Sequence, residues 1–99
     1  MNNSEAECVA GVLKAVAHPV RLRIVELLAQ GEMCVGDIVR ELGEKQAVTS
    51  QHLNTMKDKG VLSSRRDGSK VCYRIENKNV IKVLDCVYDH CEHGKKTAM

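Results

Sequence analysis

The sequence predicts a mainly α-helical fold that carries one β-hairpin, and three observations support this prediction. Residues 33 to 60 read as two short helices joined by a tight corner, which is the pattern of a helix-turn-helix. Residues 61 to 76 change to alternating polarity around Asp67-Gly68, a strong hairpin signal. Strongly apolar helices precede and follow these two segments. A helix-turn-helix followed by a basic hairpin is a winged helix-turn-helix.

The composition narrows the class of protein. A chain of 99 residues with 43% hydrophobic residues suits one globular domain, residues 1 to 99. Its aromatic residues are Tyr73 and Tyr88, which argues against stacking platforms for single-stranded nucleic acid and against ring-lined pockets. The sequence has no Cys-x-x-Cys motif, no Gly-rich phosphate loop and no Ser/His/Asp set near a predicted cleft. We therefore expect that the protein is not an enzyme. No apolar run approaches the ~20 residues of a membrane span, and no signal peptide precedes the domain, so we expect a cytoplasmic protein without a membrane partner.

The first two helices meet at a proline. The N-terminal helix, about residues 5 to 17, is rich in Ala and Gly, which would let another helix approach closely. His18-Pro19 interrupts it, because the residue before proline is pushed out of the α region. Pro19 then suits the first turn of the next helix, which Gly31 closes. That second helix is expected to bury Leu22, Ile24, Val25, Leu27 and Leu28.

The helix-turn-helix, residues 33 to 60, has an unusual polar face. Gly43 ends its first helix, where positive φ is wanted, and the second helix starts near Gln46. The apolar side of the second helix is expected to hold Val48, His52, Leu53 and Met56. The other side offers short hydrogen-bonding side chains, Gln46, Thr49, Ser50, Gln51 and Asn54. Amides bond bidentately to adenine and hydroxyls bond base edges or phosphate, so this face suits DNA; the alternative is an ordinary helical corner.

The hairpin, residues 61 to 76, is basic at its tip. The residues expected to lie along the DNA backbone or in the minor groove are Arg65, Arg66, Ser69 and Lys70. Alone, such a hairpin is more often a solvated charged surface. Directly after a polar recognition helix, it favours DNA binding over a winged helix that binds only protein.

The last helix, about residues 77 to 92, is apolar over too much of its circumference for a simple surface helix. The helix at residues 5 to 17 has the same excess. Two apolar terminal helices on a small domain predict a two-fold dimer interface.

Residues 13 to 75, about two-thirds of the chain, closely resemble the ArsR/SmtB family of bacterial metal- and thiol-sensing repressors. The most specific parts are LKAVAHPVRLRIVELL, QAVTSQHL and RRDGSKVCYRI. The resemblance implies a homodimer, built by its first and last helices, that occupies a palindromic double-stranded DNA operator until an effector binds. It places on the recognition helix the residues Gln46, Thr49, Ser50, Gln51 and His52. His52 falls on the apolar side, and the alternative for it is packing or a phosphate contact. Arg66, Gly68 and Lys70 fall in the wing.

The family's arsenite and cadmium sensors carry Cys-Val-Cys at the start of the third helix, whereas this chain has Cys34-Val35-Gly36. The residue types near the C-terminus still suit a soft metal. The candidate metal ligands are Cys34, Cys86, His90, Cys91 and His93. Two thiolates with one or two imidazoles would suit Zn²⁺, Cd²⁺ or Cu⁺, whereas arsenite prefers three thiolates. We therefore expect release of the operator on sensing a soft metal or metalloid (zinc, cadmium or arsenic), with no obligatory cofactor.

The alternative effector is reactive sulfur or an oxidant. The family's persulfide sensors pair a cysteine of the second helix with one near the end of the last, and Cys91 resembles the latter. The second helix here has no cysteine, so Cys8 or Cys34 would have to replace the partner. Five cysteines in a reducing compartment agree with thiol chemistry or metal binding. Cys72 is expected to sit in the wing without a role.

Overall fold

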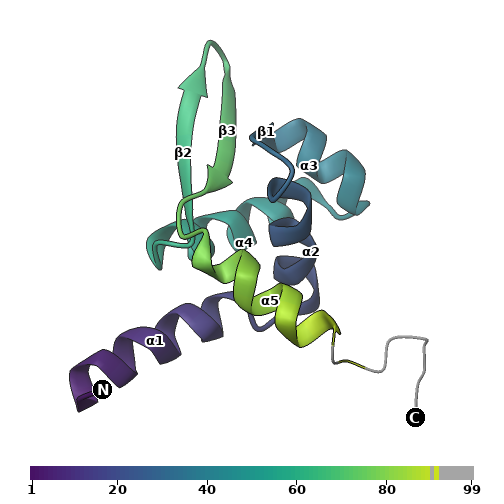
Figure 1. The fold of residues 1–99 in the computed structure, drawn as a ribbon. Helices are drawn as coiled ribbons and strands as arrows, with labels where there is room; N and C mark the ends of the chain where they lie inside the picture. The colour runs from purple at the N-terminus through teal and green to yellow at the C-terminus, as the bar shows by residue number, and fades with distance from the viewer. Residues whose placement is uncertain (90, 92–99) are drawn as a thin grey trace.

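The computed structural model describes residues 1–89 and residue 91 of the chain. In chain order the elements are α1 (Asn3–Val16), α2 (Pro19–Leu28), β1 (Met33–Cys34), α3 (Val35–Leu42), α4 (Gln46–Asp58), β2 (Leu62–Asp67), β3 (Lys70–Ile75) and α5 (Asn79–Asp89). Figure 1 shows α1 projecting from the body, the β2–β3 hairpin rising from the opposite end, and α5 crossing the front. The predicted winged helix-turn-helix is confirmed.

The α1–α2 junction follows the predicted break. The side chain of Asn2 accepts a hydrogen bond from the Glu5 N–H and the Glu5 carboxylate accepts one from the Asn2 N–H, which together form a capping box at the start of α1. His18 is extended and its Nδ1 accepts from the Val20 N–H at 3.1 Å, which caps α2. Pro19 occupies the first turn, where its missing N–H costs nothing. The sharp turn at this junction directs α1 away from the rest of the domain.

The sheet has three antiparallel strands in the order β1-β3-β2, one more than we predicted. β2 and β3 pair from Leu62–Ile75 to Asp67–Lys70, and Gly68 turns between them with φ 65°. The third strand is only Met33–Cys34, with Cys34 opposite Cys72. Two residues are too few to show the alternation that marks a strand in sequence, which is why β1 was missed.

The core lies where α2, α3, α4 and the base of the hairpin meet. Its largest fully buried side chains are Ile24, Ile38, Thr49, Leu53, Met56, Val61 and Leu62. Leu22, expected in the core, is instead 40% exposed, so the buried side of α2 is narrower than its composition indicated. None of the helices in the described part of the chain is long and apolar enough to cross a membrane.

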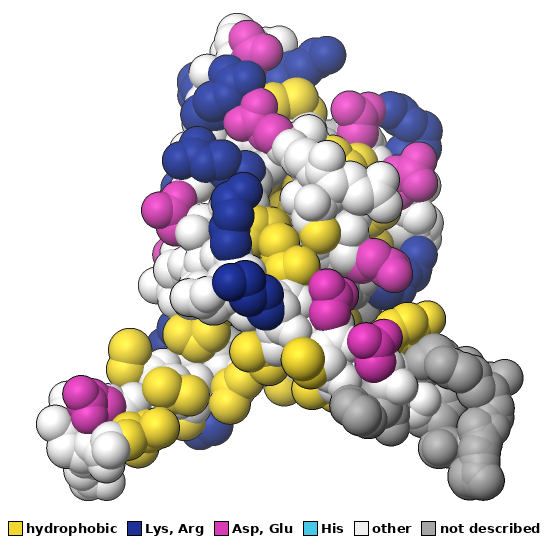
Figure 2. Space-filling model, in the orientation of Figure 1, with side chains coloured by type: hydrophobic (Ala, Val, Ile, Leu, Met, Phe, Trp, Pro, Cys, Tyr) yellow, Lys and Arg dark blue, Asp and Glu magenta, His cyan; other side chains and the backbone are white. Residues whose placement is uncertain are grey.

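Apolar side chains also remain on the surface of the two terminal helices. On α1, Val9 and Leu13 are 45% and 49% exposed; on α5, Val83 and Val87 are 46% and 59% exposed. Figure 2 shows hydrophobic side chains gathered over α1 and the lower part of the molecule, whereas Lys and Arg side chains follow the hairpin. The described chain therefore presents an apolar end and a basic end.

Candidate nucleic-acid interface and cysteine sites

α4 is held with its N-terminal half at the surface by the corner that precedes it. Gly43 adopts φ 70°, and its N–H donates to the Val39 carbonyl at 3.0 Å, which ends α3. Arg23 of α2 donates to the Leu42 carbonyl at 3.3 Å and so fixes the same corner from the other side. The residues of α4 exposed between Gln46 and Asn54 are Gln46, Ala47, Val48, Gln51 and Asn54.

The exposed face of α4 differs from the predicted one at two adjacent residues. Thr49, placed with the DNA-contacting residues, is fully buried, and its hydroxyl has no hydrogen-bond partner within residues 1–89 and 91. Val48, placed in the core, is 36% exposed. The shape of threonine matches that of valine, so its methyl group packs among apolar neighbours even though its hydroxyl suggested a polar face. This correction removes Thr49 from the candidate interface and adds Val48.

His52 faces α2 instead of the surface. Its Nδ1 accepts from the Arg21 Nε at 3.0 Å, and its ring centroid lies 4.5 Å from that of His18. Burial, followed by the positive charges of His18 and Arg21, lowers the pKa of His52 from its ordinary value of 6.5. The neutral imidazole thus accepts a hydrogen bond that ties the recognition helix to α2.

Of the four basic residues of the hairpin, Arg65 and Arg74 are in ion pairs, Arg74 with Glu76 at 3.5 Å, whereas Arg66 and Lys70 are exposed. The Nε and Nη2 of Arg65 donate to the two carboxylate oxygens of Glu32 at 2.8 and 2.7 Å. This bidentate pair lowers the pKa of Glu32, chiefly through the hydrogen bonds from Arg65. Arg66 and Lys70 are exposed on β2 and β3. Arg65 therefore joins the hairpin to the segment before β1, whereas Arg66 and Lys70 face solvent.

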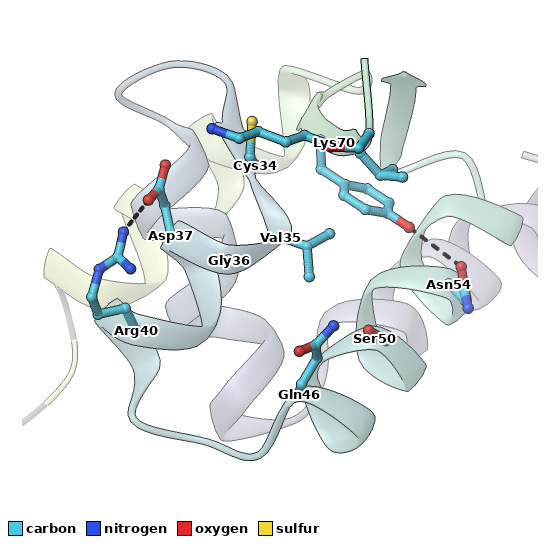
Figure 3. A pocket seen from close by; sticks show the side chains of 12 residues that line it. Cys34, Val35, Gly36, Asp37, Arg40, Gln46, Ser50, Asn54 and Lys70 are labelled. Atoms are coloured by element: carbon cyan, nitrogen blue, oxygen red, sulfur yellow. Dashed lines mark hydrogen bonds and ion pairs between the residues drawn. The ribbon is translucent and has the colours of Figure 1, made fainter. Parts of the chain in front are cut away.

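A cleft of about 570 Å³ separates α4 from the hairpin, and we call it the wing cleft. It is lined by the start of α3, by Gln46, Ser50 and Asn54 of α4, and by Lys70 and Tyr73 of β3 (Figure 3). The Tyr73 hydroxyl donates to Asn54 Oδ1 at 3.4 Å, and burial raises the pKa of Tyr73. The recognition helix and the wing thus share one polar concave surface.

Cys34 also lines the wing cleft and is bonded to Cys72, which corrects the expectation that Cys72 has no role. The two residues face each other across β1 and β3, and their Cα atoms are 3.8 Å apart. Cys72 is only 3% exposed, whereas Cys34 is half-buried. The remaining cysteines, Cys8, Cys86 and Cys91, are free and exposed.

Three of the five candidate metal ligands, Cys34, Cys86 and Cys91, lie among the described residues, and they do not form a group that could hold a metal ion. Of these five residues, His90 and His93 lie outside the described residues. Within the described ranges, no group of three or more His, Cys, Asp or Glu side chains is placed to hold a metal ion. The alternative redox set is likewise divided, since Cys34 is bonded to Cys72 whereas Cys8 and Cys91 are exposed on α1 and after α5. Sequence reasoning missed the Cys34–Cys72 pair because only the unpredicted strand β1 places these residues opposite each other.

Known proteins resemble this chain over most of its length. The family model for bacterial regulatory proteins of the arsR family matches residues 18–64. Nodulation protein NolR of Rhizobium meliloti is 36% identical over 87 residues, which cover 88% of this chain and 71% of NolR. The biofilm growth-associated repressor of Agrobacterium fabrum is 34% identical over 80 residues, 81% of this chain and 68% of that protein.

Two further matches extend the comparison. The cadmium resistance transcriptional regulatory protein CadC of Listeria innocua is 36% identical over 84 residues, 84% of this chain and 71% of CadC. Among solved structures, the homodimeric winged helix-turn-helix DNA-binding domain of Mb0332 from Mycobacterium bovis superposes with a TM-score of 0.81. It is 33% identical, and the match covers 98% of this chain and 96% of that domain.

Proposed function

The chain belongs to the ArsR family of bacterial transcriptional regulators, and from this premise we propose that it is a repressor that occupies a palindromic operator as a homodimer. A DNA-binding regulator of this family is not an enzyme. The observation that most supports the proposal is the wing cleft, where an amide-bearing helix face adjoins a basic hairpin. As a repressor works beside the chromosome, we place it in the cytoplasm.

We assign base reading to α4 and backbone contacts to the wing. Gln46 and Gln51 are exposed amides suited to adenine, with Ser50 beside them in the wing cleft. Val48 is exposed on the same helix and suits the methyl group of thymine. Arg66 and Lys70 would contact phosphates, which position the protein without reading sequence. Arg65 supports the wing through Glu32, and His52 supports α4 through Arg21.

The partner we propose for the apolar end is a second copy of the chain. The exposed apolar residues of this end belong to the helices predicted within residues 5 to 17 and 77 to 92, which are the first and last in the chain. A two-fold dimer would bury both and present two recognition helices to successive major grooves. We retain the single-domain assignment over residues 1 to 99 for each copy.

We propose that the effector acts through cysteine thiols. A soft metal or metalloid remains one candidate: Cys86 and Cys91 are exposed thiols on one end of the chain, and the similar CadC is a cadmium resistance regulator. Zinc, cadmium or arsenic would bind there with His90 and His93 as further ligands. Reactive sulfur or an oxidant is the second candidate, which the contact between Cys34 and Cys72 favours.

Fluorescence anisotropy tests the repressor function. The reduced protein is titrated into labelled DNA from upstream of its own gene, at several salt concentrations, with a base-shuffled duplex as the control. We expect the upstream DNA to bind at least tenfold more tightly than the shuffled duplex. Affinity should fall linearly on a log–log plot against salt, because phosphate contacts release counterions. Equal affinity for both duplexes would refute the assignment of a specific operator-binding repressor.

A further inference from the structure

We propose that Cys34 and Cys72 form a redox-active dithiol that reacts with low-molecular-weight disulfides and whose oxidation weakens operator binding. The proposal rests on the repressor function and names a regulatory site for it. The two residues come from different parts of the chain and meet only because β1 pairs with β3. Their Cα atoms are 3.8 Å apart and their sulfur atoms are bonded, so the pairing of β1 with β3 brings the two side chains within bonding distance.

The two thiols differ in access, which assigns each a role. Cys34 lines the open wing cleft and is half-buried, so a small disulfide can reach it. It is also the N-cap residue of α3, and the partial positive charge of a helix N-terminus favours the nucleophilic thiolate. Asp37 in the first turn of α3 is paired with Arg40, and Lys70 lines the same cleft (Figure 3). Cys72 is only 3% exposed and suits the resolving thiol.

The reaction is a pair of thiol–disulfide exchanges. The Cys34 thiolate attacks one sulfur of the disulfide RSSR, whose S–S bond breaks, and RS⁻ leaves and takes up a proton. Cys72 loses its proton to solvent and attacks the Cys34 sulfur, which releases the second RS⁻. The Cys34–Cys72 bond forms, the two protein thiols lose two electrons, and RSSR is reduced to two RSH.

The location of the Cys34–Cys72 bond explains why oxidation would change the affinity of the protein for DNA. β1 leads directly into α3, the first helix of the helix-turn-helix, whereas β3 is the inner strand of the wing. Tyr73, next to Cys72, contacts Asn54 of the recognition helix. In the reduced protein the two-residue β1 is held to β3 without a covalent link, so the wing and the helix pair can adjust separately to the duplex. The disulfide removes that adjustment.

The test uses full-length protein in which Cys8, Cys86 and Cys91 are changed to Ser, so that only the pair remains. Reduced protein is treated with oxidised glutathione, and peptide mass spectrometry then locates the linkage. Anisotropy against the upstream DNA compares the two redox states. We expect a Cys34–Cys72 peptide and an affinity about tenfold lower, a typical coupling between two sites, restored by dithiothreitol. Adding Cys34→Ser, or Cys34→Ala as a second variant, should abolish the loss of affinity that oxidised glutathione causes, when each variant is compared with its own reduced form.

Two results would overturn the proposal. One is the absence of a Cys34–Cys72 peptide after oxidation. The other is that the linkage forms while the two redox states bind DNA within twofold of each other. Failure of the reduced protein to bind any upstream DNA is a different outcome, because it refutes the repressor function, whereas the peptide measurement still decides whether the dithiol reacts.

Discussion

At the scale of single residues, we propose that the DNA-binding surface divides into side chains that read bases and side chains that contact the DNA backbone. Gln51 is exposed on α4, and Arg66 is exposed at the hairpin. Among residues 1–89 and 91, neither side chain has a hydrogen-bonded partner, in contrast to Arg65, which is held by Glu32. The two residues therefore allow the two kinds of contact to be tested separately.

We predict that Gln51→Ala relaxes sequence preference whereas Arg66→Ala weakens binding to every duplex. Loss of a bidentate amide–adenine contact should cost about 1–3 kcal/mol at one operator position, and loss of a phosphate contact should reduce the salt slope by about 1. Anisotropy with a panel of single-base operator variants at three salt concentrations measures both. If the two variants change the panel in the same way, our division of contacts is wrong.

His52 leads to a prediction about pH. Its pKa is lowered in the folded protein, mainly by burial, so below about pH 6.5 the unfolded chain binds more protons than the folded one. The contribution of His52 to stability is thus present at neutral pH and is lost as pH falls through its folded pKa. We expect the urea midpoint to fall between pH 7 and pH 5 by less in His52→Gln, which does not titrate, than in the unaltered protein. Identical falls in both proteins would exclude His52 as the cause.

Single positions on α4 also mark the limit of prediction from sequence. The polar face was placed correctly for Gln46, Gln51 and Asn54, which are exposed. The predicted positions of Thr49 and Val48 were reversed, since Thr49 is buried and Val48 is exposed. The helical period fixes a face only to within one position, and threonine packs like valine. Such a detail depends on the angle at which α4 meets α2 and α3, which no local pattern encodes.

At the scale of elements, the turn and cap residues of the sequence predicted the helix-turn-helix and the hairpin. The His18-Pro19 break, the Gly43 cap and the Asp67-Gly68 turn all lie where the sequence indicated. β1 was not predictable, since it depends on a long-range pairing with β3 and has only two residues. Because β1 was not predicted, the contact between Cys34 and Cys72 was not predicted either.

We predict that the Cys34–Cys72 bond raises the free energy of unfolding. The residues are 38 apart in sequence, and closing a loop of that length in the unfolded chain corresponds to about 4 kcal/mol in the chain-entropy model. Urea unfolding of the oxidised and reduced forms at one protein concentration measures the difference. Cys34→Ser is the control and should be insensitive to oxidant. A reduced form as stable as the oxidised one would contradict the prediction.

At the scale of the whole molecule, we propose that the apolar end forms the dimer and the basic end contacts DNA. The excess apolar character of the terminal helices was visible in the sequence, and the structure places it on exposed positions of α1 and α5. The sequence also predicted that the hairpin is basic. The structure places this hairpin at the end of the domain opposite the apolar one (Figure 2). The geometry of a dimer depends on contacts with a second copy of the chain. The helical period of one chain could therefore indicate only which surface a dimer would use.

We predict that Val87→Glu prevents dimerisation. This side chain is 59% exposed on α5, and a buried, unpaired carboxylate in a dimer interface is strongly unfavourable. Sedimentation velocity should show a shift to monomer, and operator affinity should fall at least tenfold because one recognition helix replaces two. Val48→Ser, at another exposed valine on α4, is the matched control and should sediment as the unaltered protein does. A Val87→Glu protein that remains a dimer would place the interface elsewhere.

The pairing of Cys34 with Cys72 has a topological consequence. The bond closes a ring of chain, and both DNA-facing helices lie inside it, whereas α1, α2 and α5 lie outside. A single proteolytic cut between residues 35 and 71 would open the ring but leave one covalent molecule on a non-reducing gel. Likewise, a mechanical pull applied at the two ends of the chain would pass from strand to strand through the sulfur bridge and bypass the ring. The oxidised protein would extend under tension while its helix-turn-helix carried no load.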